Sequence, residues 1–95
     1  MQEVQWIFNS NESTFIIDEA GERIAEMEVG IRGNEMSIYH TEVKSELEGQ
    51  GIARRLLDAA SEHARNNKLM VVPLCPYVLA QFEKHPEEYS DIWKK

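Results

Sequence analysis

The chain has 95 residues and a formal net charge of −7 at neutral pH, and 42% of its residues are hydrophobic and 28% charged. This length predicts one domain spanning residues 1–95, and the composition is that of a globular protein and excludes a disordered one. The negative charge argues against sequence-independent binding to nucleic acid, which needs Lys and Arg to neutralise phosphates, and favours cationic partners such as amines or lysine side chains.

Simple features of the chain exclude several further classes. The single Cys75 cannot form an internal disulfide, and no Cys/His cluster has the spacing of metal ligands. The apolar runs are too short for a membrane span, and the N-terminus does not read as a secretory signal. We therefore expect a cytoplasmic protein without a metal or a membrane partner. Because small domains bury limited surface, we expect a monomer or a weak homodimer.

Four strands are predicted in the first half of the chain. Their apolar residues alternate with polar ones around residues 4–8, 14–17, 25–32 and 35–43. Turn-forming residues separate them at 10–12, 18–21 and 33–34. In the third strand, Ala25, Met27 and Val29 alternate with charged residues, as in a strand that is exposed on one face. With such short connections, an antiparallel meander is the expected topology.

A helix is predicted from about residue 51 to residue 67. Its apolar face contains Ile52, Leu56, Leu57, Ala60 and Ala64. Its polar face contains Arg54, Arg55, Asp58, Ser61, Glu62 and Arg65. The amphipathic pattern predicts that this helix packs on one face of the sheet.

The remaining residues predict one more strand and one or two helices. The wholly apolar run 69–72 is typical of an interior strand covered on both faces. Pro73 and Pro76 limit that strand, a helix can begin near Pro76 and continue over 77–84, and residues 87–93 can form a last short helix. The predicted class is therefore α/β, with an antiparallel meander followed by β-α-β-α. The strand pair around the first helix should be a right-handed parallel crossover.

A turn containing Gly49 and Gly51 joins the fourth strand to the first helix. The helix N-terminus carries unpaired N–H groups and partial positive charge, so this turn can bind a phosphate or pyrophosphate. It is neither a P-loop nor a G-x-G-x-x-G loop, and an ordinary turn is the alternative. Ligands in such sheets bind at the carboxyl ends of strands, which brings residues 40–43 and 74–75 to the same place and favours a binding site.

These segments resemble the GCN5-related N-acetyltransferases. In that superfamily a strand with a Val leads into Q/R-x-x-G-x-G/A, whose amides hold the pyrophosphate of acetyl-CoA. Residues 48–53, Glu-Gly-Gln-Gly-Ile-Ala, fit this pattern, with Val43 ahead of them. Four blocks resemble the minimal, single-domain yjdJ-like branch: residues 40–43, 46–51, 71–77 and 85–87. The resemblance extends over about residues 21–93.

The resemblance implies an acetyl-CoA-dependent N-acetyltransferase that acts on a small amine or a lysine side chain. A non-catalytic acyl-CoA-binding or sensor module is the alternative. The residues expected to bind the cofactor are Thr41, Val43, Gly49, Gln50, Gly51, Ile52, Ala53, Arg54 and Arg55. Two positions depart from the superfamily. Glu48 replaces the usual Gln or Arg, so backbone amides must do most of the anion binding, and Phe82 replaces a Tyr that protonates the leaving thiolate.

Three residues are candidates for catalysis: Cys75, His40 and Glu42. Cys75 can be a nucleophile that takes the acetyl group, a proton donor to the leaving thiolate, or a small buried hydrophobe. A helix beginning at Pro76 and a nearby His40 would each favour reactivity. His40 can deprotonate an ammonium substrate or activate Cys75, or it can be a core residue on the face of Met36 and Ile38.

The remaining candidates have alternative structural roles. Glu42 can be a base, an anchor for the substrate ammonium, or a solvated strand residue. Tyr77 is the nearest phenol to replace the missing Tyr, although a packing role is expected. Arg54 and Arg55 can reach CoA phosphates or lie on a solvated helix face. Two histidines are expected to be structural: His63 on the helix surface, and His85 beside Pro86.

Overall fold

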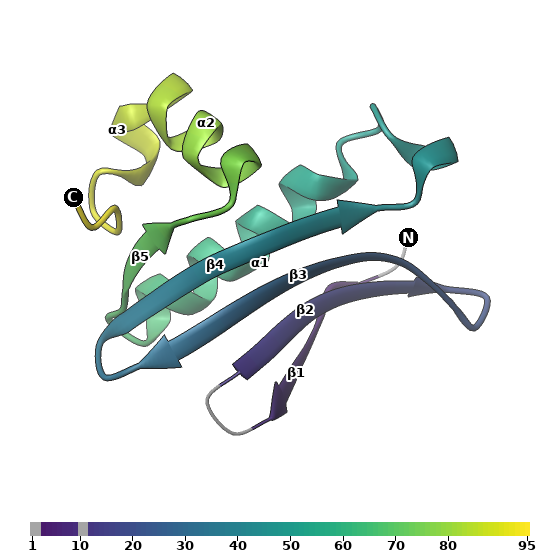
Figure 1. Cartoon of the computed structure of the whole chain (residues 1–95), viewed down its shortest axis with the longest axis horizontal. Coiled ribbons are helices and arrows are strands. Elements are labelled where there is room, and N and C mark those ends of the chain that lie inside the picture. The colour runs from purple at the N-terminus through teal and green to yellow at the C-terminus, as the bar shows by residue number, and fades with distance from the viewer. Residues whose placement is uncertain (1–2, 10–11) are drawn as a thin grey trace.

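A five-stranded sheet in the order β1-β2-β3-β4-β5 forms the centre of the computed structural model, which describes residues 3–9 and 12–95 (Figure 1). The elements are β1 (Gln5–Asn9), β2 (Glu12–Glu19), β3 (Glu22–Arg32), β4 (Glu35–Val43), the 3-10 helix η1 (Ser45–Leu47), α1 (Ile52–Asn66), β5 (Met70–Pro73), α2 (Pro76–Lys84) and α3 (Pro86–Tyr89). Strands β1 to β4 form an antiparallel meander, and β5 is parallel to β4. The predicted class and element order are confirmed. The turn predicted at 10–12 lies mostly outside the described residues.

The core lies between the sheet and α1, which runs behind β3 and β4 in Figure 1. The predicted apolar face of α1 is buried, as are the alternating residues Ala25, Met27 and Val29 of β3. On the opposite face of the sheet, Glu28, His40 and Glu42 are exposed. Period-two alternation therefore gives β3 and β4 one apolar face and one charged face.

A β-bulge at Tyr39 interrupts the alternation of β4. Ile38 is opposite Val29 on β3 and His40 is opposite Glu28, so Tyr39 has no partner in the ladder. The ring of Tyr39 lies over Gly30, where a Cβ atom would come within 2.7 Å of the Tyr39 hydroxyl. Because one extra residue reverses the facing of everything after it, His40 lies on the face opposite Met36 and Ile38. The prediction that these three residues share a face is wrong.

Two residues of α1 are more buried than their pattern predicts. Ser61, expected on the polar face, is only 3% exposed. His63, expected on the surface, is half-buried, and its ring centroid lies 4.0 Å from that of Trp6 and 5.9 Å from that of Phe15. Strands β1 and β2 thus contact a side of the helix that the amphipathic pattern leaves for solvent.

The C-terminal residues pack differently from the prediction. In β5, Val71 is buried, but Met70 and Val72 are half-buried, so the strand is not covered on both faces. Helix α3 ends at Tyr89, which makes the predicted helix over 87–93 wrong in extent. Residues beyond it form an isolated bridge with β5, in which the Val71 N–H donates to the Ile92 carbonyl at 2.6 Å.

Candidate functional site

The site is built where β4 and β5 separate. Their pairing ends at Ile38 and Pro73, and the Cys75 N–H donates to the Ile38 carbonyl at 2.8 Å. Directly after β4, the Lys44 N–H donates to the Ile24 carbonyl of β3 at 2.9 Å. The backbone groups of Lys44 thus point toward β3. Because successive residues of a strand point their N–H and C=O groups to opposite sides, those of Thr41 and Val43 point away from β3. The N–H and C=O groups of these two residues therefore face the side that β5 has left open.

The glycine turn presents a second set of backbone donors. Gly49 and Gly51 have φ angles of +85° and +78°, which L side chains rarely adopt. Gly51 is the N-cap of α1 and no side chain caps the helix; the Arg55 N–H donates to the Gly51 carbonyl at 3.2 Å. The N–H groups of residues 52–54 therefore lack helical acceptors and carry the positive end of the helix dipole. A Cβ at Gly51 would meet nothing within 4 Å, so the space before the turn is open.

A pocket of about 330 Å³ joins these backbone groups. It is lined by Thr41, Val43, Leu47, Glu48, Gly49, Gly51, Ile52, Ala53, Arg54 and Tyr77. The pocket brings together the end of β4 and the glycine turn, as predicted, but residues 74 and 75 do not line it; Cys75 reaches it only through its contact with Thr41. A second hollow, of about 570 Å³, shares Thr41, Val43 and Glu48 with the first. Its other lining residues are Glu22, Arg23, Ile24, Ala25, Glu26, Glu42, Lys44 and Ser45.

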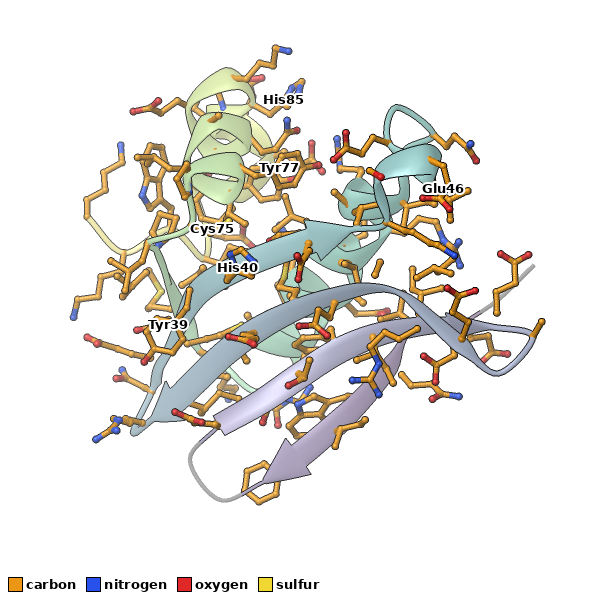
Figure 2. The ribbon with its side chains drawn as sticks, turned by 45° about the vertical axis from the view of Figure 1, so that its right-hand side comes forward. Tyr39, His40, Glu46, Cys75, Tyr77 and His85 are labelled. Atoms are coloured by element: carbon orange, nitrogen blue, oxygen red, sulfur yellow. The ribbon has the colours of Figure 1, made fainter. Side chains whose placement is uncertain are left out.

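Cys75 lies directly behind the pocket wall. It is the N-cap of α2, so the predicted helix start beside the thiol is confirmed. The residue is 3% exposed, and its Sγ–H donates to Thr41 Oγ1 at 3.4 Å. Since Thr41 lines the pocket, the thiol is one side chain away from the open space. Figure 2 shows Cys75 at the base of α2, above His40 of β4.

His40 and Glu42 form a pair on the open face of the sheet. His40 Nε2 lies 3.9 Å from Glu42 Oε1, and their side chains are 57% and 69% exposed. Because of the bulge at Tyr39, Thr41 rather than His40 lies on the side of Cys75: Thr41 contacts Cys75, whereas His40 contacts Glu42.

Arg54 lines the pocket, but carboxylates already bind its guanidinium. Its Nε donates to Asp58 Oδ1 at 2.9 Å, and an Nη atom donates to Glu88. The hydrogen bond to Asp58 is the main cause that raises the pKa of Arg54. Arg55, in the same turn, is half-buried. Since the charge of Arg54 is already paired with these carboxylates, the backbone N–H groups at the start of α1 are the positive groups left to bind an anion in the pocket.

Three lining residues were not among the sequence candidates for cofactor binding: Leu47, Glu48 and Tyr77. Leu47 ends η1 and gives the pocket an apolar wall. Tyr77 is half-buried in the first turn of α2, and burial raises the pKa of its phenol. Tyr77 could have been included among the cofactor-binding candidates from the sequence, because it is only two residues after Cys75. Behind it, burial raises the pKa of Tyr89 to about 12.

Neither a metal-binding cluster nor a membrane-spanning helix is found in residues 3–9 and 12–95. No three or more His, Cys, Asp and Glu side chains gather there in a way that could hold a metal ion. None of the helices in these residues is long and apolar enough to cross a bilayer.

Comparisons with known proteins point to one family. The family model described as GCN5-related N-acetyl-transferase matches residues 14–92. The solution structure of a proposed GCN5-like N-acetyltransferase from Staphylococcus aureus is 33% identical, with a TM-score of 0.72, and the match covers 99% of this chain and 91% of that one.

More distant structures share the fold. A ribosomal-protein-alanine N-acetyltransferase from Brucella melitensis biovar Abortus has a TM-score of 0.66 at 17% identity, over 92% of this chain and 64% of that one. An aminoglycoside N-acetyltransferase in complex with CoA has a TM-score of 0.61 at 14% identity, over 92% of this chain and 71% of that one.

Proposed function

Because this chain belongs to the GCN5-related N-acetyltransferase family, we propose that it transfers the acetyl group of acetyl-CoA to a small amine or a lysine side chain. The observation that carries the proposal is the pocket, which combines an uncapped helix N-terminus with an open strip of strand backbone. The N–H groups of the helix N-terminus can bind an anion, and the open backbone groups of the strand can bind a ligand that contains several amides.

The two ends of the pocket match the two parts of CoA. The pyrophosphate binds the N–H groups of residues 49–53, where the turn is open to solvent. The pantetheine arm contains amides, which pair with the free N–H and C=O groups of Thr41 and Val43 much as an added strand would. This arrangement directs the thioester along β4 toward the bulge at Tyr39 and toward Cys75.

Transfer begins when the neutral amine attacks the thioester carbonyl. A C–N bond forms, the C–S bond breaks, and its electron pair goes to the CoA sulfur. The amine loses one proton and the CoA thiolate gains one, so the reaction is balanced. His40 and Glu42 lie on the exposed face and can accept the amine proton from an acceptor that arrives there.

Cys75 is the proton donor to the leaving thiolate in this scheme. A relay through acetyl-Cys75 would require the thiol to meet first the thioester and then the amine. Its 3% exposure and its hydrogen bond to Thr41 favour the donor role, which needs contact with the CoA sulfur alone.

The second hollow favours an amine as the acceptor. Four of its lining residues are glutamates, Glu22, Glu26, Glu42 and Glu48, against the two cations Arg23 and Lys44. It opens beside the pocket through Thr41 and Val43. A non-catalytic module that only senses acyl-CoA is the competing function, because it would need the first pocket and not the second.

Calorimetric titration with CoA tests the cofactor site, with two matched variants. Gly51→Val should abolish binding because its side chain fills the open space before the turn. Gly21→Val is the control: Gly21 has a φ of +80° and equally open surroundings, but lies in the β2–β3 turn. It should bind CoA like the wild type. Absence of CoA binding by the wild-type protein would refute both the enzyme and the sensor.

Turnover separates the enzyme from the sensor. Release of free CoA thiol is measured with acetyl-CoA and a panel of polyamines, amino acids and lysine peptides. We expect acceptor-dependent release with at least one amine class. CoA binding without release across the panel would favour the sensor.

A further inference from the structure

Strand β1 forms an open edge of the sheet. It pairs with β2 on one side, and on its other side none of the strands in the described residues pairs with it. The opposite edge differs, because the Trp93 bridge and its hydrogen bonds cover part of β5. An open edge presents a row of unpaired N–H and C=O groups to which another strand can bind.

The exposed apolar side chains concentrate on this edge. Trp6, Ile7 and Phe8 are consecutive and are 43%, 44% and 62% exposed. Strand β1 lacks two of the usual protections of an edge, since its five residues include neither a charged residue nor a proline. The Trp6 ring is held in place by stacking on Phe15, at a centroid distance of 6.2 Å. The edge is thus apolar and partly preorganised.

The sequence of β1, Gln-Trp-Ile-Phe-Asn, is nearly symmetric about Ile7. In an antiparallel pair of two such strands centred on Ile7, Trp6 of each copy is opposite Phe8 of the other, and Ile7 is opposite Ile7. Aromatic pairs then meet on the face of α1, and the two isoleucines meet on the other face. This is the self-complementarity that a two-fold interface requires.

We propose that two copies of this chain associate through antiparallel pairing of their β1 strands. The two sheets become one continuous sheet, and the edge is removed. In this register neither Glu3 nor Glu12 is opposite a glutamate of the second copy, which matters for a chain of net charge −7. A contact between two five-residue strands is small, so the dimer is weak and depends on concentration.

Sedimentation of the full-length chain tests the association. Over about 10 μM to about 1 mM, the range for weak contacts, we expect the wild type to shift from monomer to dimer. Ile7→Lys places two like charges opposite each other on the axis and should keep the protein monomeric. Leu79→Lys, on α2 and 36% exposed, is the matched control and should dimerise like the wild type.

Circular dichroism checks that all three proteins are folded. A wild type that stays monomeric to the highest concentration overturns the proposal. So does a dimer that persists in folded Ile7→Lys.

Cysteine cross-linking tests the register. In Ile7→Cys the two new thiols are directly opposite, where Cα atoms lie about 4.5–5.5 Å apart, within the range of a disulfide. In Gln5→Cys each thiol is opposite residue 9, so the two thiols are separated by about 13 Å along the strands. Mild oxidation should give a covalent dimer with Ile7→Cys and not with Gln5→Cys. Equal yields from both variants would overturn the proposed pairing.

Discussion

At the scale of single residues, the proposal that Cys75 is the proton donor rests on the surroundings of its thiol. The thiol is buried, begins a helix and donates to Thr41, whose side chain lines the pocket. His40, one of the groups that could have activated the thiol, contacts Glu42 on the other face of the strand. A proton donor needs only a short path to the CoA sulfur, whereas a relay nucleophile also needs access for the amine.

Cys75→Ala tests this assignment. Loss of the proton donor should slow acetyl transfer by roughly 10²–10⁴-fold, the usual contribution of acid–base catalysis, and leave CoA affinity unchanged. Steady-state rates and calorimetry measure the two quantities. Full activity in Cys75→Ala would mean that the thiol only packs.

Mass spectrometry distinguishes the donor from the relay. Wild-type protein incubated with acetyl-CoA and no acceptor should gain no acetyl group on Cys75. An adduct that hydroxylamine removes would establish the relay instead.

At the scale of elements, β1 and β2 hold α1 through an aromatic cluster around His63. Its ring packs against Trp6 and Phe15, and burial lowers the pKa of His63 below its ordinary value of 6.5. The folded state therefore disfavours the charged imidazole. Between the folded pKa and pH 7 the unfolded chain binds more protons, so stability falls as the pH falls.

This coupling predicts a pH dependence that one substitution removes. The free energy of unfolding, measured with urea, should decrease from pH 7.5 to pH 5 in the wild type, and this decrease should be smaller in His63→Gln. An NMR titration of the His63 ring protons should give a midpoint below 6.5. A midpoint at or above 6.5, or an unchanged slope in the variant, would contradict the role assigned to burial.

At the scale of the whole molecule, a ligand that binds the folded chain should add noticeably to its stability, because the domain is small. A domain of 95 residues buries a limited fraction of its surface, and this one leaves a charged sheet face and an apolar edge exposed. A ligand that binds only the folded state adds stability by mass action.

CoA should therefore raise the melting temperature in a concentration-dependent way. At 100 times the dissociation constant the added stability is about 2.7 kcal/mol, which corresponds to roughly 10 °C or more for a domain of this size. Differential scanning fluorimetry measures the shift, and Gly51→Val should show none. An equal shift in Gly51→Val would mean that CoA binds somewhere other than the glycine turn.

Local patterns in the sequence determined the element order, the meander, the buried face of α1 and the glycine turn. They could do so because alternation, helical spacing and turn chemistry act between residues close in the chain. The facing of His40 and Glu42, by contrast, depends on a bulge that arises from pairing β4 with β3. The burial of His63 and the pairing of Arg54 with Glu88 likewise depend on segments far apart in sequence. Only the tertiary structure decided these, because register and packing are set by the partner strand or helix.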